Sequence, residues 1–194
     1  MNPRTVFIAA PLFTLSYGVI RILDGLDGSR GPGLAWTTGH LAFLAAMACF
    51  VAIFGHLRRM AEHDVFSKVA SVIATIGVAA LCGQFVIDLV NGFVSADHAA
   101  MAVHSASIHD IPGVAPALYD VGPYFFYAGQ LALVVRLAVL RKIKLWTPFL
   151  VLCDLLFPII DKDFIPLGAA LLLVSFVSIS KQVPVTAERA PALI

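Results

Sequence analysis

Long apolar segments separated by short polar ones make up most of the chain. A helix that crosses the hydrocarbon core of a bilayer needs about 20 largely apolar residues. Because such segments recur along the chain, the pattern predicts an all-α fold, a single-domain, polytopic transmembrane helix bundle of about six spans. The predicted spans cover residues 5–23, 35–56, 69–93, 121–141, 145–160 and 164–180.

The last two predicted spans are short. Asp161, Lys162 and Asp163 mark a tight turn between them, so a single broken or re-entrant pair of helices is an alternative for this region. The other connections are brief except for residues 94–120, which are expected to form a partly helical cap loop on the outer side. Residues 183–194 are expected to form a disordered cytoplasmic tail.

The composition also indicates a membrane protein. Hydrophobic residues make up 60% of the chain, charged residues make up 13%, and the mean hydropathy is +0.92, which lies outside the range of soluble domains. The net charge of +1 is spread along the chain, so no basic patch is available for nucleic acid. The three cysteines form no CxxC pair and are interpreted as packing residues.

The basic residues outside the spans fall on one side of the membrane if six helices alternate across it. Because cytoplasmic loops carry an excess of Lys and Arg, both termini are expected to be cytoplasmic, in a multi-pass protein of the plasma membrane. The outer side is then acidic. The cytoplasmic side holds Arg4, Arg58, Arg59, Lys68, Arg141, Lys142, Lys144, Lys181 and Arg189, and the outer side holds Asp24, Asp27, Asp97, Asp110, Asp120, Asp161 and Asp163.

Polar side chains recur within the spans at steps of three, four or seven residues, which place them on one face of each helix. Such side chains are costly in a bilayer unless they face protein or water, so each is a candidate functional residue. The stripes are Thr14, Tyr17, Arg21 and Asp24; Gln84, Asp88 and Asn91; Asp120, Tyr124, Tyr127 and Gln130; and Thr147, Asp154 and Asp161, with Trp36 and His40 near the outer end of the second span.

With this topology the stripes converge on a pocket in the outer half of the membrane. It is expected to be acidic, rimmed by aromatic rings and closed beneath by an apolar layer, which is a common form of small-molecule site. Removal from water disfavours the charged form of a carboxylic acid, so an Asp at membrane depth can stay protonated and act as a general acid. Arg21 and Asp24, one turn apart, are expected to form an ion pair.

Helix packing is the alternative interpretation of the same residues. Gln84, Asn91 and Gln130 can join helices through hydrogen bonds, and so can Asp88 and Asp154, although a carboxylate is costly in that role. Aspartates at the span boundaries can be solvated loop ends. Aromatic residues near the ends of the spans can belong to the interfacial belt of a membrane protein.

Histidines suggest a rival function, because transmembrane cytochromes hold haem between histidines on facing helices. His40 is well placed for this, but its partner would come from the cap loop, at His98 or His104. Residues 97–110 could also bind a metal ion, although their spacing matches no standard ligand pattern. No signature of a zinc protease, α/β-hydrolase, P-loop or dinucleotide-binding enzyme is present.

Isolated acidic residues stand within or beside the spans: Asp24 and Asp27 in RILDGLDG, Asp88 in QFVIDLVNG and Asp154 in VLCDLLFPIID. In these residues, in its size and in its lack of soluble domains, the chain resembles the small integral-membrane terpene cyclases of bacteria. These enzymes act on prenylated natural products, the drimentine type among them. The resemblance covers the whole chain in outline.

The resemblance implies a cyclisation without metal or other cofactor, started by protonating a terminal alkene or epoxide of a lipophilic prenylated substrate. Asp88 and Asp154 are the first candidates for acid and counter-charge, and Asp24 is the third. Aromatic faces would stabilise a passing carbocation by about 0.5 to 2 kcal/mol each. The candidate substrate-binding residues are Tyr17, Arg21, Trp36, His40, Gln84, Phe85, Asn91, Tyr124, Phe125, Tyr127 and Gln130.

The sequence leaves two other functions open. One is a haem- or quinone-binding electron-transfer protein centred on His40. The other is a non-enzymatic lipid-binding protein in which the polar stripes only set helix packing. For the cyclase hypothesis, an outward-facing pocket is unexpected for a substrate made in the cytosol unless the prenyl chain enters laterally through the bilayer.

Overall fold

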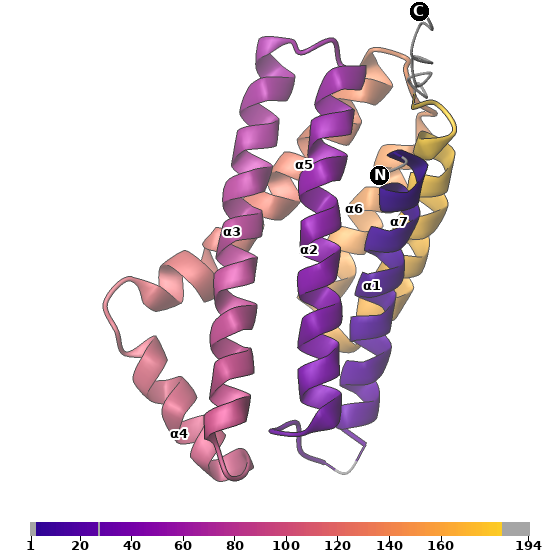
Figure 1. Cartoon of the computed structure of the whole chain (residues 1–194). Helices are drawn as coiled ribbons and strands as arrows, with labels where there is room; N and C mark the ends of the chain where they lie inside the picture. Colours follow the sequence, from indigo (N-terminus) through magenta and orange to yellow (C-terminus); the bar gives the residue numbers. More distant parts are fainter. Residues whose placement is uncertain (1–2, 27, 184–194) are drawn as a thin grey trace, which may run out of the picture.

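The computed structural model describes residues 3–26 and 28–183 of the 194-residue chain. These residues contain helices and no strands, which confirms the predicted all-α bundle (Figure 1). The elements are α1 (Pro3–Asp24), α2 (Leu34–Met60), α3 (Val65–Val94), α4 (His98–His109), the π-helix η1 (Ala115–Asp120), α5 (Gly122–Val139), α6 (Trp146–Ile160), the 3₁₀-helix η2 (Lys162–Phe164) and α7 (Ile165–Ser180).

Five helical segments of the described chain are long and apolar enough to cross a membrane: α1, α2, α3, the η1–α5 segment and the η2–α7 segment. The sixth apolar helix, α6, has 15 residues. At 1.5 Å per residue it is about 22 Å long, short of the roughly 30 Å of a hydrocarbon core. The expected six spans are therefore five long helices and one short one.

The region predicted as two short spans forms two separate helices, α6 and α7. Pro158 removes a backbone donor in the last turn of α6, and α6 ends at Ile160. The carboxylate of Asp161 then accepts a hydrogen bond of 2.8 Å from the backbone N–H of Asp163 and so stabilises the turn.

The region predicted as a cap loop holds α4 and η1. The π-helix η1 continues through Val121 into α5, so the fourth apolar segment begins at Ala115 and not at residue 121. A Cβ atom on Gly122 would stand 1.8 Å from the carbonyl oxygen of Ala117, so glycine is needed where the π-helix passes into the α-helix. Short π-helical turns are rare and frequently occur at functional sites.

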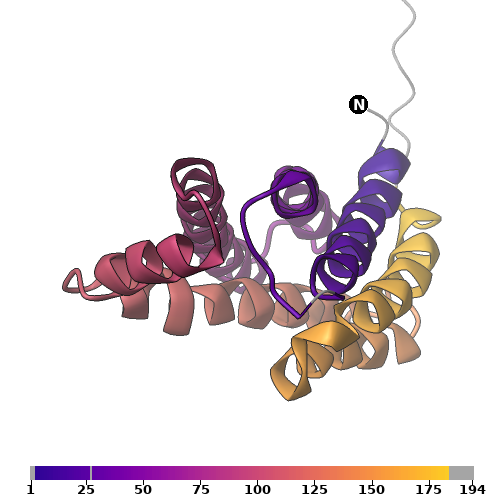
Figure 2. The same ribbon diagram turned by 90° about the horizontal axis from the view of Figure 1, so that it is seen from below.

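Helix α4 lies at the edge of the bundle, beside the C-terminal half of α3 (Figures 1 and 2). The side-chain amide of Asn91 donates to the carbonyl oxygen of Met101 (3.1 Å) and to the hydroxyl of Ser105 (2.8 Å), and so ties α3 to α4. The start of α4 is held by a 2.7 Å hydrogen bond between His98 Nδ1 and the carbonyl oxygen of Arg30. The cap is thus attached by a few polar contacts.

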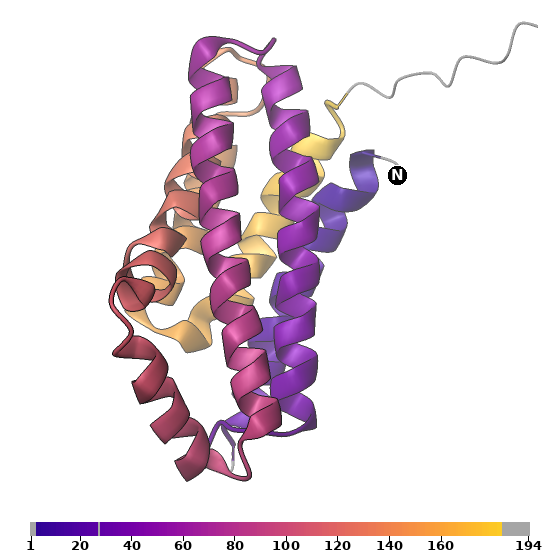
Figure 3. The same ribbon diagram turned by 60° about the vertical axis from the view of Figure 1, so that its left-hand side comes forward.

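The start of α1 and the end of α7 lie at the same end of the bundle as the α2–α3 and α5–α6 turns (Figures 1 and 3). This agrees with helices that alternate in direction. The assignment of this end to the cytoplasm stays a prediction. Residues 184–194 of the predicted tail lie outside the described residues, whereas Val183 is buried. We call this end the basic end, from its residues Arg4, Arg58, Arg59, Lys68, Arg136, Arg141, Lys142, Lys144 and Lys181.

Two ion pairs join the turns at the basic end. The carboxylate of Asp64 accepts hydrogen bonds from the backbone N–H of Ser67 and from the guanidinium of Arg136, each at 2.6 Å. These two contacts hold the pKa of the Asp64 carboxyl below its ordinary value of 3.8. The charged form therefore stabilises the fold above that pH, and the stabilisation is lost as the pH falls through the lowered pKa. Lys142 donates to Glu62 at 2.8 Å.

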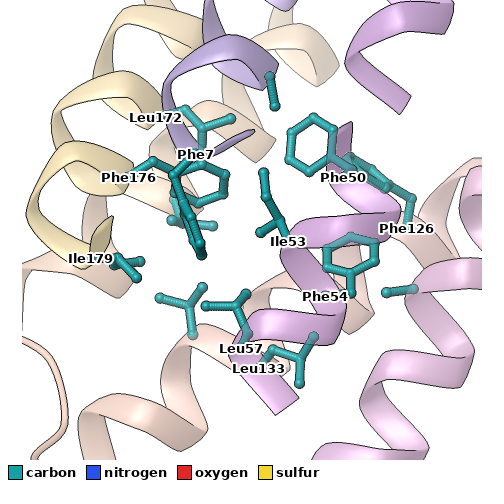
Figure 4. Close-up of a cluster of buried hydrophobic side chains, with 14 of the residues drawn as sticks. Phe7, Phe50, Ile53, Phe54, Leu57, Phe126, Leu133, Leu172, Phe176 and Ile179 are labelled. Atoms are coloured by element: carbon teal, nitrogen blue, oxygen red, sulfur yellow. The ribbon is translucent and has the colours of Figure 1, made fainter. Parts of the chain in front are cut away.

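Between the basic end and the middle of the bundle the side chains are closely packed and apolar (Figure 4). On the α3–α5 side the backbones approach closely, because a Cβ atom on Gly77 would stand 1.8 Å from the backbone nitrogen of Phe126. Small residues allow such contacts between membrane helices. We call this region the packed half, which is formed by Phe7, Phe50, Ile53, Phe54, Leu57, Phe126, Leu133, Leu172, Phe176 and Ile179.

Candidate functional site

A pocket of about 320 Å³ opens in the half of the bundle away from the basic end, between residues of every span. This volume falls at the lower end of the range of about 300–1,000 Å³ for small-molecule sites. Polar stripes predicted on three different helices meet here. We call this cavity the outer pocket; the residues that matter most to its chemistry are Tyr17, Phe43, Gln84, Phe85, Tyr124 and Lys162.

A second, smaller cavity of about 40 Å³ adjoins the outer pocket on the side of the packed half. The two cavities share four lining residues, Phe43, Tyr127, Pro158 and Ile165. We call the smaller one the deep cavity. Its floor is made by apolar side chains, and its one carboxyl group belongs to Asp154.

Asp154 lies on the inward face of α6, with 8% of its surface exposed. The glycine opposite, Gly168 of α7, allows this close packing, because a Cβ atom at that position would stand 3.0 Å from the Asp154 carboxylate oxygen. No hydrogen bond reaches this carboxyl group from the described part of the chain. A buried carboxyl in this state favours its neutral form, which can donate a proton.

Aromatic rings surround both cavities. In the outer pocket the ring of Phe43 stacks on Phe85 at 3.9 Å between centroids, and Tyr17 packs against both rings at 5.0 and 5.2 Å. In the deep cavity Phe126 lies 4.8 Å from Phe50, nearly perpendicular to it. The faces and edges of these rings give a surface that is apolar and can still attract a cation.

Asp88 lies beside the outer pocket and is half-buried. Its carboxylate accepts a hydrogen bond of 2.9 Å from the hydroxyl of Tyr119 in η1, and its backbone carbonyl accepts one of 3.0 Å from the indole of Trp36. Asp88 therefore joins α3 to α2 and to the π-helix. Of the two aspartates predicted as the acid, Asp154 lines the deep cavity. Asp88 holds Tyr119, which lines the outer pocket.

His40 is buried between the rings of Trp36 and Phe85, at centroid distances of 4.1 and 5.0 Å. Its Nδ1 donates to the carbonyl oxygen of Trp36 at 2.7 Å. The cavity that His40 borders measures about 10 Å³, which leaves no room for a cofactor ring. Within residues 3–26 and 28–183, no three His, Cys, Asp or Glu side chains gather as metal ligands.

The chain matches no family model, no curated protein and no solved structure.

The predicted ion pair between Arg21 and Asp24 is wrong, because Arg21 pairs with a different carboxylate. Arg21 donates to Asp163 of η2, and Arg30 donates to the same carboxylate at 3.0 Å. These contacts fasten the α6–α7 turn to the end of α1 and to the loop after it. Asp24 borders the small cavity beside His40, away from both the outer pocket and the deep cavity. Asp27 lies outside the described residues.

Five other predicted binding residues lie away from the two cavities. Asn91 binds α4, as described above. Phe125 points to the opposite side of α5, into a separate groove beside Gly113 and Ile76. Gln130 is fully buried, and its amide has no hydrogen-bond partner among the described residues. Trp36 and His40 line only the small cavity between α1 and α2.

The sequence analysis missed several residues that line the site, among them Phe43, Tyr119, Pro158 and Lys162. Phe43 was one apolar residue among many in its span, although it lies one turn beyond His40 on the same helix face. Tyr119 was assigned to the cap loop. Pro158 and Lys162 follow Asp154 at steps of four residues, and this spacing could have identified them from the sequence.

Proposed function

We propose that this protein is a membrane-embedded terpene cyclase in which Asp154 starts the cyclisation of a prenyl chain by protonating it. The observation that carries this proposal is the buried Asp154 carboxyl, which lines an aromatic cavity and has no hydrogen-bond partner within the described residues. A carboxyl used for helix packing would be expected to bind a donor on a neighbouring helix.

The reaction needs no oxidant or reductant. The Asp154 carboxyl gives its proton to the less substituted carbon of the terminal double bond, and the positive charge forms on the neighbouring tertiary carbon. The π electrons of the next double bond then form the ring carbon–carbon bond, which moves the charge along the chain. Water at the outer pocket takes up the final proton, and the Asp154 carboxylate regains one from water. Product and substrate are isomers.

The aromatic rings match the path of the charge. A cation formed near Asp154 would meet the faces of Phe43, Phe126 and Tyr127, which border the deep cavity. Each such contact is worth about 0.5 to 2 kcal/mol. The apolar walls also exclude water, which would otherwise quench the cation before the rings close.

Asp88 supplies a negative charge at the edge of the site. Since its carboxylate is held by Tyr119, it is fixed at the end of the pocket toward which the charge migrates. A fixed counter-charge stabilises a developing cation without reorganising during the reaction. Asp88 thus serves as a positioning and electrostatic residue.

The test is an assay of the full chain in liposomes that contain farnesyl phosphate, with products separated by chromatography and identified by mass spectrometry. Asp154→Asn keeps the shape and removes the acid, so turnover should fall by at least about 10²-fold. Asp161→Asn, an exposed carboxyl at the end of the same helix, is the matched control and should retain full activity. Asp88→Asn should lose activity partially. Equal turnover of Asp154→Asn and wild type would overturn the proposal.

We also propose that the basic end faces the cytoplasm of a bacterial plasma membrane and that the outer pocket faces the other side. The excess of Lys and Arg at that end supports this orientation. In a variant without native cysteines, a cysteine at exposed Ala96 should react with a membrane-impermeant maleimide in intact cells, and one at Lys144 should not. The reverse labelling pattern would contradict the orientation.

A further inference from the structure

The outer pocket opens toward the side of the bundle where α5 and α6 separate. These helices meet at the turn of residues 140–145 and diverge toward η1 and η2 (Figure 1). Tyr124 on α5 and Ile159 on α6 both line the pocket, and they are 53% and 55% exposed. We expect this side of the bundle to face lipid chains in a bilayer. We call the opening between Tyr124 and Ile159 the lateral slit.

The wall near the slit carries hydrogen-bond donors that the protein does not use. Gln84, Tyr124 and Lys162 come from α3, α5 and η2, and all three line the outer pocket. Within the described parts of the chain none of these side chains has a hydrogen-bond or ion-pair partner. Three convergent, unused donors match a ligand group that bears oxygen acceptors.

We infer that the pocket takes its ligand from the membrane through the lateral slit, chain end first, and holds an oxygen-bearing head group at Gln84, Tyr124 and Lys162. Lys162 lines the outer pocket and Asp154 lines the deep cavity, and the two cavities adjoin through Phe43, Tyr127, Pro158 and Ile165. An amphiphile whose head lies at Lys162 can therefore extend its chain to the deep cavity. This inference rests on the proposed function where it places the reacting chain end at Asp154.

A larger cavity than the outer pocket, an apolar groove of about 530 Å³ between α3 and α4, does not fit this ligand. Its polar residues are already occupied: Asn91 binds α4, His104 Nδ1 lies 3.0 Å from the hydroxyl of Ser95, and Ser107 donates to the carbonyl oxygen of Val103. The groove offers only apolar walls, which lipid chains can fill without selection.

Photolabelling tests the binding mode directly. Farnesyl phosphate with a diazirine at the chain end is added to the full chain in liposomes, and labelled residues are found by mass spectrometry. The label is expected on residues of the deep cavity, such as Met47 and Phe50. A label on Val90 or Ile108 of the α3–α4 groove would overturn the inference.

Lys162 tests the head-group contact. Lys162→Met should weaken labelling by farnesyl phosphate about tenfold, the loss expected when a hydrogen bond to a charged group is removed. Lys162→Arg should restore most of it, and Lys144→Met at the basic end is the control. Farnesol, which lacks the phosphate, should be affected much less by Lys162→Met. Unchanged labelling of Lys162→Met by farnesyl phosphate would contradict the proposed head-group site.

The lateral slit is tested by closing it. A variant without native cysteines that carries Ala128→Cys, at an exposed position one turn beyond Tyr124, and Ile159→Cys is treated with bismaleimides of increasing length. A linker that joins both cysteines should abolish photolabelling of the deep cavity, whereas a small monofunctional maleimide on the same variant should leave most of it. Full labelling of the linked protein would show that the ligand uses another route.

These results separate the two proposals. If the deep cavity is labelled through the slit but no cyclised product forms, the proposed function fails and the binding mode stands. If product forms while the linked protein remains active, the binding mode fails and the cyclase proposal stands.

Discussion

The two halves of this bundle solve the same packing problem in different ways. In the packed half, large side chains such as Phe54, Leu57 and Leu133 are almost completely buried, and glycines let α3 and α5 approach. In the half with the outer pocket, helices of unequal length separate and leave a cavity. The packed half has the features of a rigid scaffold. The other half is packed less closely and contains the candidate site.

The difference also shows in the polar groups. At the basic end Asp64, Arg136, Glu62 and Lys142 are all paired. Around the outer pocket Gln84, Tyr124 and Lys162 have no partner within the described residues. Buried polar atoms without a partner also occur elsewhere in the described chain, at Arg58, Gln130 and Thr147. The outer pocket differs because three unpaired donors from three elements line one cavity, which adjoins the buried Asp154 carboxyl, and this arrangement indicates binding chemistry there.

A substitution in the packed half should affect stability most. Leu133→Ala removes a fully buried side chain and leaves a cavity, so the free energy of unfolding should fall by about 2–5 kcal/mol. Denaturation of purified protein in mixed micelles measures this loss. Val135→Ala, at a partly exposed position on the same helix, should change little. If both variants were equally stable, the packed half would not be the scaffold.

A substitution at the site should affect turnover and leave the fold intact. Phe43→Leu keeps an apolar side chain but removes a ring that lines both cavities, so turnover should slow by the equivalent of about 0.5–2 kcal/mol. Initial rates in the liposome assay measure the change. Phe149→Leu, at an exposed position on α6, is the control. A larger loss of stability than of turnover would assign Phe43 to packing.

The spacing of polar residues predicted much of the site, because a three- or four-residue step places side chains on one helix face. Tyr17, Gln84, Tyr124 and Tyr127 were identified in this way, and all four line the outer pocket. Phe125 was predicted as an aromatic neighbour of Tyr124 and not from this spacing. Consecutive residues lie about 100° apart on a helix, so Phe125 points away from the pocket that its neighbours line.

The contacts that the sequence did not reveal join distant segments. Arg21 pairs with Asp163, 142 residues away, although Asp24 lies one turn from it. Spacing along one helix cannot show which neighbouring helix is closest. Tyr119 was missed for a related reason, since η1 has no apolar periodicity to mark it as the start of α5. The apolar segments and several of their polar faces were predictable, whereas the start of the η1–α5 segment and the pairing between helices were not.

The most direct test of the central claim is to run the cyclisation in D₂O. If Asp154 starts the reaction by protonating the chain end, its exchangeable carboxyl proton becomes deuterium. Each product molecule should then carry one deuterium at the carbon that was the less substituted carbon of the terminal double bond, as shown by NMR and mass spectrometry. A cyclised product without deuterium at that carbon, formed by the wild-type protein, would contradict initiation by an acid.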